Sequence, residues 1–409
     1  MNLPRIQSIL REHGFDAWLF YDFRGSNPIA WRTFGIPESV HCTRRWAIIV
    51  PAKGEVVKIV NGIEPHTLAA VDAREIRYAN RQDWHDVITT TLQGKRRIAL
   101  EYSPNNAIPV VSFVDGGTVE WLRSLGFDVV SSADIVQQYS AVWSEKQFEE
   151  NKETAKLLRT AMMRSALGFV RESILAGKSI TEYDVQQNVW QFFEHNNMTS
   201  YSMPSVSVNA NSANAHYGPT ADNSATLKRG DVLLVDMWAK RSTEPDSVYS
   251  DITWMAYIDE TVPERPAHIF NTIAAGRDAA LRLVQDEFGK NPAKPVRGCD
   301  VDDACRTVIE EAGFGKYFIH RTGHSITTDT HGSGANMDNF ETNDIRPLIP
   351  MTSFSIEPGI YIEGDIGMRT EIDVVISASG EVIVSGGSAQ RELLPLLAPS
   401  LDLEALISA

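Results

Sequence analysis

The chain has 409 residues, of which 43% are hydrophobic and 22% are charged, a composition typical of globular proteins. Its formal net charge of −15 would repel a phosphate backbone, so we expect no nucleic-acid partner. No stretch approaches the roughly 18 consecutive apolar residues of a membrane helix, and the first residues lack the apolar run of a secretory signal. We therefore expect a soluble cytoplasmic protein with no membrane partner.

The first 142 residues predict a compact α/β domain. Residues 4–13 place Ile6, Ile9 and Leu10 on one helical stripe, and Gly14 follows where a left-handed residue would end a helix. Short runs rich in β-branched and aromatic residues come next, separated by Gly, Pro, Asn and Lys: DAWLFYDF, RRWAIIV, VVKIV, RRIALEY and FDVVSS. Domains of roughly 100–200 residues favour two domains for this length, so we place the boundary near Trp143.

Residues 143–409 predict an α+β domain with helices grouped against an antiparallel sheet. A long amphipathic helix opens it and ends near Gly177, and Thr181 is the expected N-cap of a second helix. From Val206 onward the pattern is mostly strand, interrupted by helices over about residues 264–288 and 300–312. The residues expected on the buried side of the first helix are Leu157, Leu158, Ala161, Met162, Leu167 and Val170.

Four carboxylates fall in apolar stretches of sequence that predict strands. Asp236 interrupts DVLLVDMWA and Glu357 interrupts FSIEPGIYI, so we expect each to lie within a strand. Asp251 and Glu371 follow 15 and 14 residues later. Because the side chains of a strand alternate between its faces, two antiparallel strand pairs could bring these four acids to one pocket. Buried carboxylates require compensating charge, so the pocket needs cations.

Two divalent cations would neutralise four carboxylates. Oxygen-rich clusters with a single imidazole suit first-row divalent ions, and a nitrogen ligand is available nearby. The segment HRTGHSITTDTH, residues 320–331, holds three of the chain's ten histidines. The residues alone do not say which of these three binds metal. The three cysteines lack CxxC spacing, so a thiolate site or disulfide framework is not expected.

An ordered set of five residues resembles the signature of the pita-bread metallopeptidases, which include methionine aminopeptidase, Xaa-Pro aminopeptidase, prolidase and the metal-free creatinase. The set is Asp236, Asp251, His324, Glu357 and Glu371. The resemblance covers roughly residues 200–375. It implies an α+β protein in which a creatinase/prolidase-like α/β domain (1–142) precedes a pita-bread catalytic domain (143–409).

The resemblance also implies roles for the five residues. Asp236 would bind one metal with both oxygens, Asp251 and Glu371 would bridge two metals, and His324 and Glu357 would complete the other. The metals would be Mn²⁺, Co²⁺, Zn²⁺ or Fe²⁺, since the same ligands accept each. A water bridging the pair would be the nucleophile, with Glu357 as its general base.

Further residues match positions beside the metals. His216, His320 and His331 would donate to the tetrahedral intermediate or carry a proton, without binding metal. Arg369 would orient Glu371 or meet a substrate carboxylate. The remaining histidines are expected to be ordinary surface or packing residues.

The resemblance favours a peptidase of the Xaa-Pro branch, an aminopeptidase P-like or prolidase-like enzyme that cleaves short peptides and forms a homodimer. Two alternatives stay open: a metal-dependent lyase or amidinohydrolase of a small molecule, and a binding module that does not cleave peptides. The chain departs from the family after Asp251-Ile-Thr, where Trp254 replaces an Arg, and after His331, where Gly332 replaces an acid. We expect both departures to border the substrate pocket.

Overall fold

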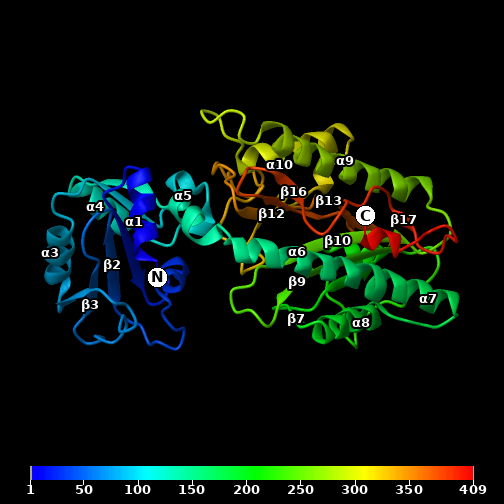
Figure 1. Ribbon diagram of the computed structural model, residues 1–409, viewed down its shortest axis with the longest axis horizontal. Coiled ribbons are helices and arrows are strands. Elements are labelled where there is room, and N and C mark those ends of the chain that lie inside the picture. Colours follow the sequence, from blue (N-terminus) through cyan, green and yellow to red (C-terminus); the bar gives the residue numbers. More distant parts are fainter. Residues whose placement is uncertain (1, 409) are drawn as a thin grey trace. The chain divides into compact units, whose positions relative to one another are not determined.

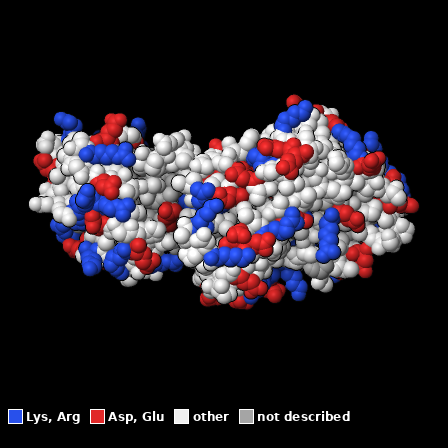
Figure 2. Space-filling model, turned by 90° about the horizontal axis from the view of Figure 1, so that it is seen from above, with Lys and Arg blue, Asp and Glu red and all other residues white. Residues whose placement is uncertain are grey.

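The computed structural model describes residues 2–408 and divides into two compact units, one ending at Ser140 and the other beginning at Ala141. Figure 1 shows each unit as strands flanked by helices. Figure 2 shows Lys and Arg interspersed with Asp and Glu on the visible faces of both units. Among the described residues, no helix has the length and apolar character needed to cross a membrane.

The first unit is built on a six-stranded sheet in the order β4-β3-β2-β1-β5-β6. The strands are β1 (Ala17–Phe23), β2 (Arg45–Pro51), β3 (Val57–Asn61), β4 (Arg74–Tyr78), β5 (Arg97–Leu100) and β6 (Asp128–Ser131). β2 runs antiparallel to both β1 and β3, while the β1–β5, β3–β4 and β5–β6 pairs are parallel. The predicted α/β character of this region is therefore present.

Helices cover both faces of this sheet. They are α1 (Leu3–Glu12), α2 (Pro28–Phe34), α3 (Arg81–Thr91), α4 (Gly116–Ser124) and α5 (Ala133–Val136). Two 3₁₀ turns, Pro104–Asn106 and Pro109–Val111, lie between α3 and α4, and a π-helical turn (Gln137–Ala141) follows α5. Ile6, Ile9 and Leu10 of α1 are buried as predicted, and Gly14 has a φ of 65°. One face of the sheet packs with α1, α2 and α5, and the other with α3 and α4.

The second unit begins with one long helical stretch. It consists of α6 (Glu145–Thr160), a π-helical segment (Ala161–Gly168) and α7 (Phe169–Leu175), and α8 (Glu182–His195) follows. Thr181 caps α8 as predicted, since its side chain accepts from the Asp184 N–H while the Asp184 carboxylate accepts from the Thr181 N–H. In Figure 1 these helices lie along one side of the strands, and α9 (Glu264–Glu287) and α10 (Gly298–Glu311) lie along the other.

Three sheets lie between these two helical layers. The first contains β7 (Met198–Thr199), β8 (Ser205–Val208), β9 (Val232–Arg241), β10 (Ser250–Tyr257) and β17 (Leu394–Pro395). The second contains β11 (Ser325–Ile326), β12 (Thr352–Ile356), β15 (Ile372–Ile376) and β16 (Val382–Val384). The third is the hairpin of β13 (Gly359–Ile362) and β14 (Ile366–Arg369). Short 3₁₀ turns complete the chain at Asn209–Ala213, Gly315–Tyr317 and Ala405–Ile407.

The core of the second unit has two parts. One packs α6, α7 and α8 against β8, β9 and β10, and the other packs α9 and α10 against β12, β14 and β15. The predicted α+β arrangement of helices against antiparallel strands is therefore observed. β9, β10, β12 and β15 lie between these two hydrophobic layers, and of the predicted acids on or beside them Asp236, Asp251 and Glu371 are buried and Glu357 is partly exposed.

Candidate metal centre

The β9–β10 ladder brings Asp236 and Asp251 to one face. The two strands are antiparallel, with Asp236 opposite Thr253 and Asp251 opposite Trp238. Residues directly opposite each other in a ladder point to the same side, so these four side chains share a face. In this register, neighbouring antiparallel strands bring the pair of acids to one face, as predicted.

Trp254 lies on the opposite face of β10. It is buried in the hydrophobic cluster formed with the helices of the first layer, and the guanidinium carbon of Arg159 lies 4.3 Å from the centre of its ring. Because Trp254 alternates with Asp251 and Thr253 along the strand, it points away from the acids. The expectation that Trp254 borders the substrate pocket is therefore wrong.

The second pair of acids lies at strand ends and not in mid-strand. Ile356 and Ile372 form the last pair of the β12–β15 ladder, and Glu357 and Glu371 are the next residues outward. The expectation that Glu357 lies within a continuous apolar strand is wrong, because the chain turns at Pro358 between β12 and β13. Glu371 nevertheless lies beside β10, since the Thr253 hydroxyl oxygen lies 2.9 Å from Glu371 Oε2.

His324 is the histidine that lies among the acids. Its Nε2 is 3.1 Å from Glu357 Oε1 and 4.0 Å from Asp251 Oδ2. Each of Asp251, His324 and Glu371 offers a ligand atom within 4.8 Å of the others, a spacing suited to a metal ion. The preceding Gly323 permits this placement, because a Cβ there would lie 1.9 Å from the Ser355 carbonyl oxygen.

Arg369 and Thr253 hold Asp236 from two sides. Arg369 Nη2 donates to Asp236 Oδ2 at 2.5 Å, and the Thr253 hydroxyl lies 2.9 Å from Asp236 Oδ1. Arg369 also donates to the Thr253 hydroxyl at 3.2 Å and to the Tyr361 hydroxyl at 3.2 Å. Arg369 thus pairs with Asp236, whereas the sequence analysis expected it to orient Glu371 or meet a substrate.

Two buried oxygens of the centre lack hydrogen-bond partners within residues 2–408, Asp251 Oδ1 and Glu371 Oε1. Burial and the charge of Asp236 raise the pKa of Asp251 well above its usual range, and burial and the charge of Asp251 do the same for the pKa of Glu371. These raised pKa values mean that ionised acids here require cations. The donor set of carboxylates and one imidazole fits divalent metal ions.

Glu357 differs electrostatically from the other acids. Burial by itself would raise its pKa, but the charge and hydrogen bond of His324 lower the pKa of Glu357 below its usual range. The Ser355 hydroxyl donates to Glu357 Oε1 at 3.0 Å. Glu357 is therefore the acid of the centre that most readily stays ionised.

Two further predicted histidines border the centre as neutral imidazoles. The His331 ring lies 4.3 Å from the His324 ring, centre to centre, and burial with the charge of His324 lowers the pKa of His331 to about 4. His320 Nε2 lies 3.0 Å from the Tyr361 hydroxyl, and burial lowers the pKa of His320. His216 is exposed on the loop after the Asn209–Ala213 turn and lies close enough to His331 to lower its pKa.

Three neighbours of the centre were not predicted from the sequence: Thr253, Tyr361 and Asp373. Thr253 and Asp373 each lie two residues beyond a predicted ligand, so strand alternation alone could have placed them on the same face. Asp373 Oδ2 accepts from the Asp251 N–H at 2.8 Å, and burial raises the pKa of Asp373 well above its usual range. Tyr361 comes from the β13–β14 hairpin, and nothing in its sequence context marks it.

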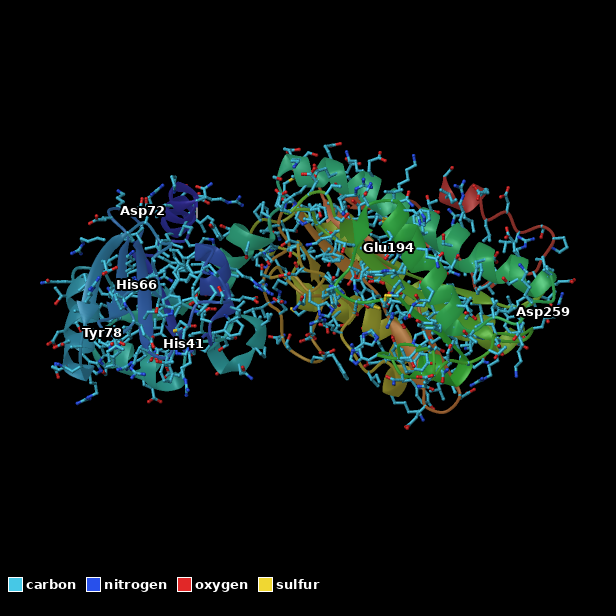
Figure 3. The ribbon with its side chains drawn as sticks, turned by 90° about the horizontal axis from the view of Figure 1, so that it is seen from below. His41, His66, Asp72, Tyr78, Glu194 and Asp259 are labelled. Atoms are coloured by element: carbon cyan, nitrogen blue, oxygen red, sulfur yellow. The ribbon has the colours of Figure 1, made fainter. Side chains whose placement is uncertain are left out.

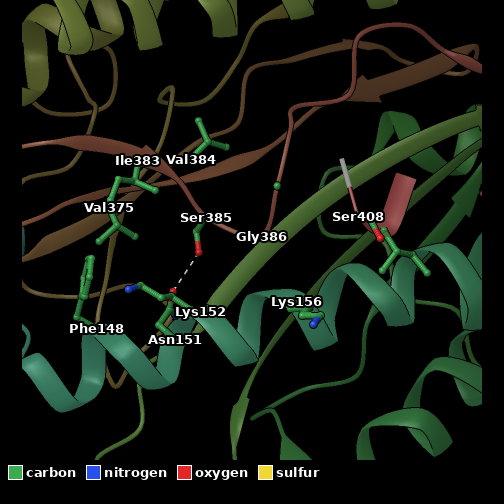
Figure 4. Close-up of a pocket in the computed structure, with 12 residues that line it drawn as sticks. Phe148, Asn151, Lys152, Lys156, Val375, Ile383, Val384, Ser385, Gly386 and Ser408 are labelled. Atoms are coloured by element: carbon green, nitrogen blue, oxygen red, sulfur yellow. Dashed lines mark hydrogen bonds between the residues drawn. The ribbon is translucent and has the colours of Figure 1, made fainter. Parts of the chain in front are cut away.

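His41 and His66, labelled in Figure 3, belong to the first unit and not to the unit that carries these acids. A cavity of about 520 Å³ lies between α6 and the β15–β16 strands, and Figure 4 shows Phe148, Val375 and Ser385 among its lining residues. None of the predicted site residues lines that cavity, so it does not mark the metal centre.

The chain is similar to known metallopeptidases. The family model described as Metallopeptidase family M24 matches residues 150–378, a span that contains all five predicted ligands. The probable dipeptidase PepE of Mycobacterium tuberculosis (strain ATCC 25618 / H37Rv) is 24% identical over 358 residues, which are 86% of this chain and 86% of that protein.

Solved structures show the same fold. Dipeptidase PepE from Mycobacterium ulcerans aligns with a TM-score of 0.66 at 20% identity, over 96% of this chain and 96% of that one. X-prolyl aminopeptidase from Caenorhabditis elegans, described as a cytosolic enzyme with a di-nuclear active site, aligns with a TM-score of 0.62 at 14% identity, over 93% of this chain and 61% of that one. The expected pita-bread fold is confirmed.

Proposed function

Because the chain belongs to metallopeptidase family M24, we propose that it is a hydrolase of short peptides that uses two divalent metal ions and prefers the bond before proline. The observation that carries the proposal is the pair of buried, unpartnered oxygens on Asp251 and Glu371, within ligand distance of His324. Oxygens of this kind require cations, and the two acids come from different sheets.

Charge supports two ions over one. The four candidate ligand acids and the adjacent Asp373 carry five negative charges when ionised, and Arg369 supplies one positive charge. Two divalent cations balance the remaining four charges, whereas one would leave two buried negative charges without compensation. Asp236 can still bind a cation, since each of its oxygens keeps a lone pair beside the bond to Arg369 or Thr253.

When bound, such ions activate a water molecule and stabilise negative charge on an attacked carbonyl oxygen. Glu357, whose pKa is lowered by His324 and which accepts from the Ser355 hydroxyl, would accept a proton from that water at a carboxylate oxygen. The neutral imidazole of His331 can donate a hydrogen bond to a developing oxyanion or pass a proton to the leaving nitrogen. His320 Nδ1 lies 2.6 Å from the Arg321 carbonyl oxygen and holds the single ring proton, so its Nε2 would act as a proton acceptor. Tyr361 orients His320 through its hydroxyl.

The test combines metal content with substrate comparison. Protein prepared in Mn²⁺ should contain two ions per chain by elemental analysis. The same protein should hydrolyse Ala-Pro or Ala-Pro-Ala with a kcat/KM roughly tenfold or more above that for Ala-Ala, as a pocket lined for a proline ring allows. Glu371→Gln serves as the inactive control.

Each part of the proposal can fail separately. One ion at saturation would exclude the dinuclear centre. Equal hydrolysis of Ala-Ala would exclude the proline preference. Absence of peptide hydrolysis by protein that holds both ions would exclude the peptidase and favour a lyase or amidinohydrolase acting on a small molecule.

A further inference from the structure

Trp238 projects from the same strand face as the candidate ligands. It lies directly opposite Asp251 in the β9–β10 ladder and two residues beyond Asp236. Cβ atoms of directly opposed residues are about 4.5–5.5 Å apart, so the Trp238 side chain starts next to Asp251, the acid expected to bridge two metals. The Trp238 side chain is partly exposed, while its indole nitrogen is buried without a hydrogen-bond partner among the described residues.

Tyr201 extends this aromatic surface toward solvent. It lies on the loop between β7 and β8, is 67% exposed, and its ring centre is 5.9 Å from that of Trp238 and 6.3 Å from that of Tyr249. Burial and then the charges of Asp251 and Asp236 raise the pKa of Tyr201, so its phenol lies within electrostatic range of both acids. The Tyr201 and Trp238 rings thus form an aromatic wall that begins opposite Asp251 and reaches solvent at Tyr201.

We propose that this aromatic wall, Tyr201 and Trp238, is a substrate subsite that selects a large aromatic or apolar side chain beside the scissile bond. The inference rests on the proposed peptidase function and adds the class of side chain that the site prefers. An exposed aromatic ring beside a reacting centre offers apolar area and stacking partners to a substrate, and offset or edge contacts between rings add to the burial of area.

The Lys240 ammonium disfavours a cationic side chain at this aromatic cluster. Aromatic rings also attract cations, so a Lys or Arg substrate is the competing occupant. However, Lys240 Nζ already lies 4.9 Å from the centre of the Tyr249 ring, where it donates to the Thr328 carbonyl oxygen at 2.8 Å. A second cation on this cluster would meet the Lys240 ammonium at close range, whereas a phenyl or leucyl group would not.

The experiment compares paired dipeptides with the Mn²⁺-loaded enzyme. Wild-type protein should cleave Phe-Pro with a kcat/KM roughly tenfold or more above that for Ala-Pro, or show the same ratio for Ala-Phe over Ala-Ala. Tyr201→Ala and Trp238→Ala should bring that ratio to within roughly threefold of one, because the apolar contact is lost. Tyr201→Phe keeps the ring and should keep the preference, and Leu175→Ala, an exposed apolar change on α7, should leave it unaltered.

Tyr201 is exposed, so Tyr201→Ala decides the matter even if Trp238→Ala does not fold. Equal cleavage of the Phe and Ala peptides by wild-type protein would overturn the inference, as would a preference that persists in Tyr201→Ala. Faster cleavage of Lys-Pro than of Phe-Pro would also overturn it, in favour of a cation site. If wild-type protein holding both metals cleaves no peptide, the proposed function fails instead.

Discussion

Arg369 and Asp236 form a buried ion pair at 2.5 Å, between β14 and β9. The pair holds the candidate ligand Asp236 in position and links the β13–β14 hairpin to the first sheet of the second unit. The contribution of this pair to stability depends on which other charges balance the carboxylates, because removing one partner of a buried pair leaves an uncompensated charge.

The first prediction concerns that pair. Arg369→Gln should destabilise the metal-free protein by about 3–5 kcal/mol, the usual cost of breaking a buried pair. The loss should be smaller in Mn²⁺, since bound cations supply part of the missing charge. Urea unfolding in EDTA and in Mn²⁺ measures both values, and Arg229→Gln, which removes an exposed pair with Asp259, is the control. An equal loss in the two conditions would contradict the assignment of Asp236 to a metal centre.

Asp251→Asn should remove at least one metal ion and abolish turnover without unfolding the second unit. The change removes a buried negative charge, so the fold of the metal-free protein has less repulsion to withstand. Elemental analysis, circular dichroism and hydrolysis assays on the same preparation provide the measurement, with the exposed Asp286→Asn as control. Full activity in Asp251→Asn would show that Asp251 is not a ligand.

The three clustered histidines should separate into two classes. His324→Ala should lose metal affinity, because its Nε2 faces Asp251 and Glu357. His320→Ala and His331→Ala should keep both ions and lose about 10²–10⁴-fold in kcat, the range for a lost proton-transfer or oxyanion group. Titration of each variant with Mn²⁺ would reveal a wrong assignment as equal metal loss in all three.

Thr253 should affect metal binding although it is not a candidate ligand. Its hydroxyl lies 2.9 Å from an oxygen of both Asp236 and Glu371, so Thr253→Val should weaken Mn²⁺ binding about 10–100-fold, as the loss of a group that orients metal ligands does. Thr253→Ser keeps the hydroxyl and should bind like wild type. Calorimetric titration distinguishes the two, and an unchanged Kd in Thr253→Val would reject this positioning role.

Glu101 in the first unit should make stability depend on pH. It is fully buried, it accepts from Trp18 Nε1 at 2.5 Å and from Asn27 Nδ2 at 2.8 Å, and burial raises its pKa from 4.5 to about 7. The folded state holds this proton more tightly than the unfolded state. Stability should therefore fall by about 3 kcal/mol as pH rises from about 4.5 to 7, and then level off.

Urea unfolding across that pH range measures the effect. Glu101→Gln should reduce the fall in stability over this range by about 3 kcal/mol, while the exposed Glu120→Gln should leave the fall unchanged. The slope that remains in Glu101→Gln is expected from the buried acids of the second unit, whose pKa values are also raised. A slope in Glu101→Gln equal to that of wild type would mean that Glu101 is already ionised at low pH in the folded protein.

Apolar periodicity accounts for what the sequence could predict of the fold. The local sequence determines the apolar faces of α1, α6 and α8 and the capping of α8 by Thr181, because each depends on residues three or four positions apart. The strand of Glu357 was misplaced because Pro358 ends β12 within an apolar run that reads as continuous.

The acids of the candidate centre could be predicted from their residue types. The contacts between separate strands could not. Charged residues in apolar strands marked the acids, since burial of an unpaired charge is unfavourable. The orientation of Trp254 follows from alternation along β10, because Trp254 lies three residues beyond Asp251 and therefore on the opposite face of the strand. Tyr361 and the Arg369–Asp236 pair join three separate strands, a relationship that only the folded chain displays.

Gly323 places a mutational limit on the centre. Its backbone passes so close to Ser355 that a Cβ would lie 1.9 Å from the carbonyl oxygen, and adjacent backbone bonds join Thr322 to Glu357 and His324 to Ser355. Every missense change at this codon adds at least one carbon atom where an oxygen already lies. A single nucleotide substitution could thus separate the imidazole from its carboxylates, leaving a gene that still encodes all five ligands and a protein that cannot assemble them.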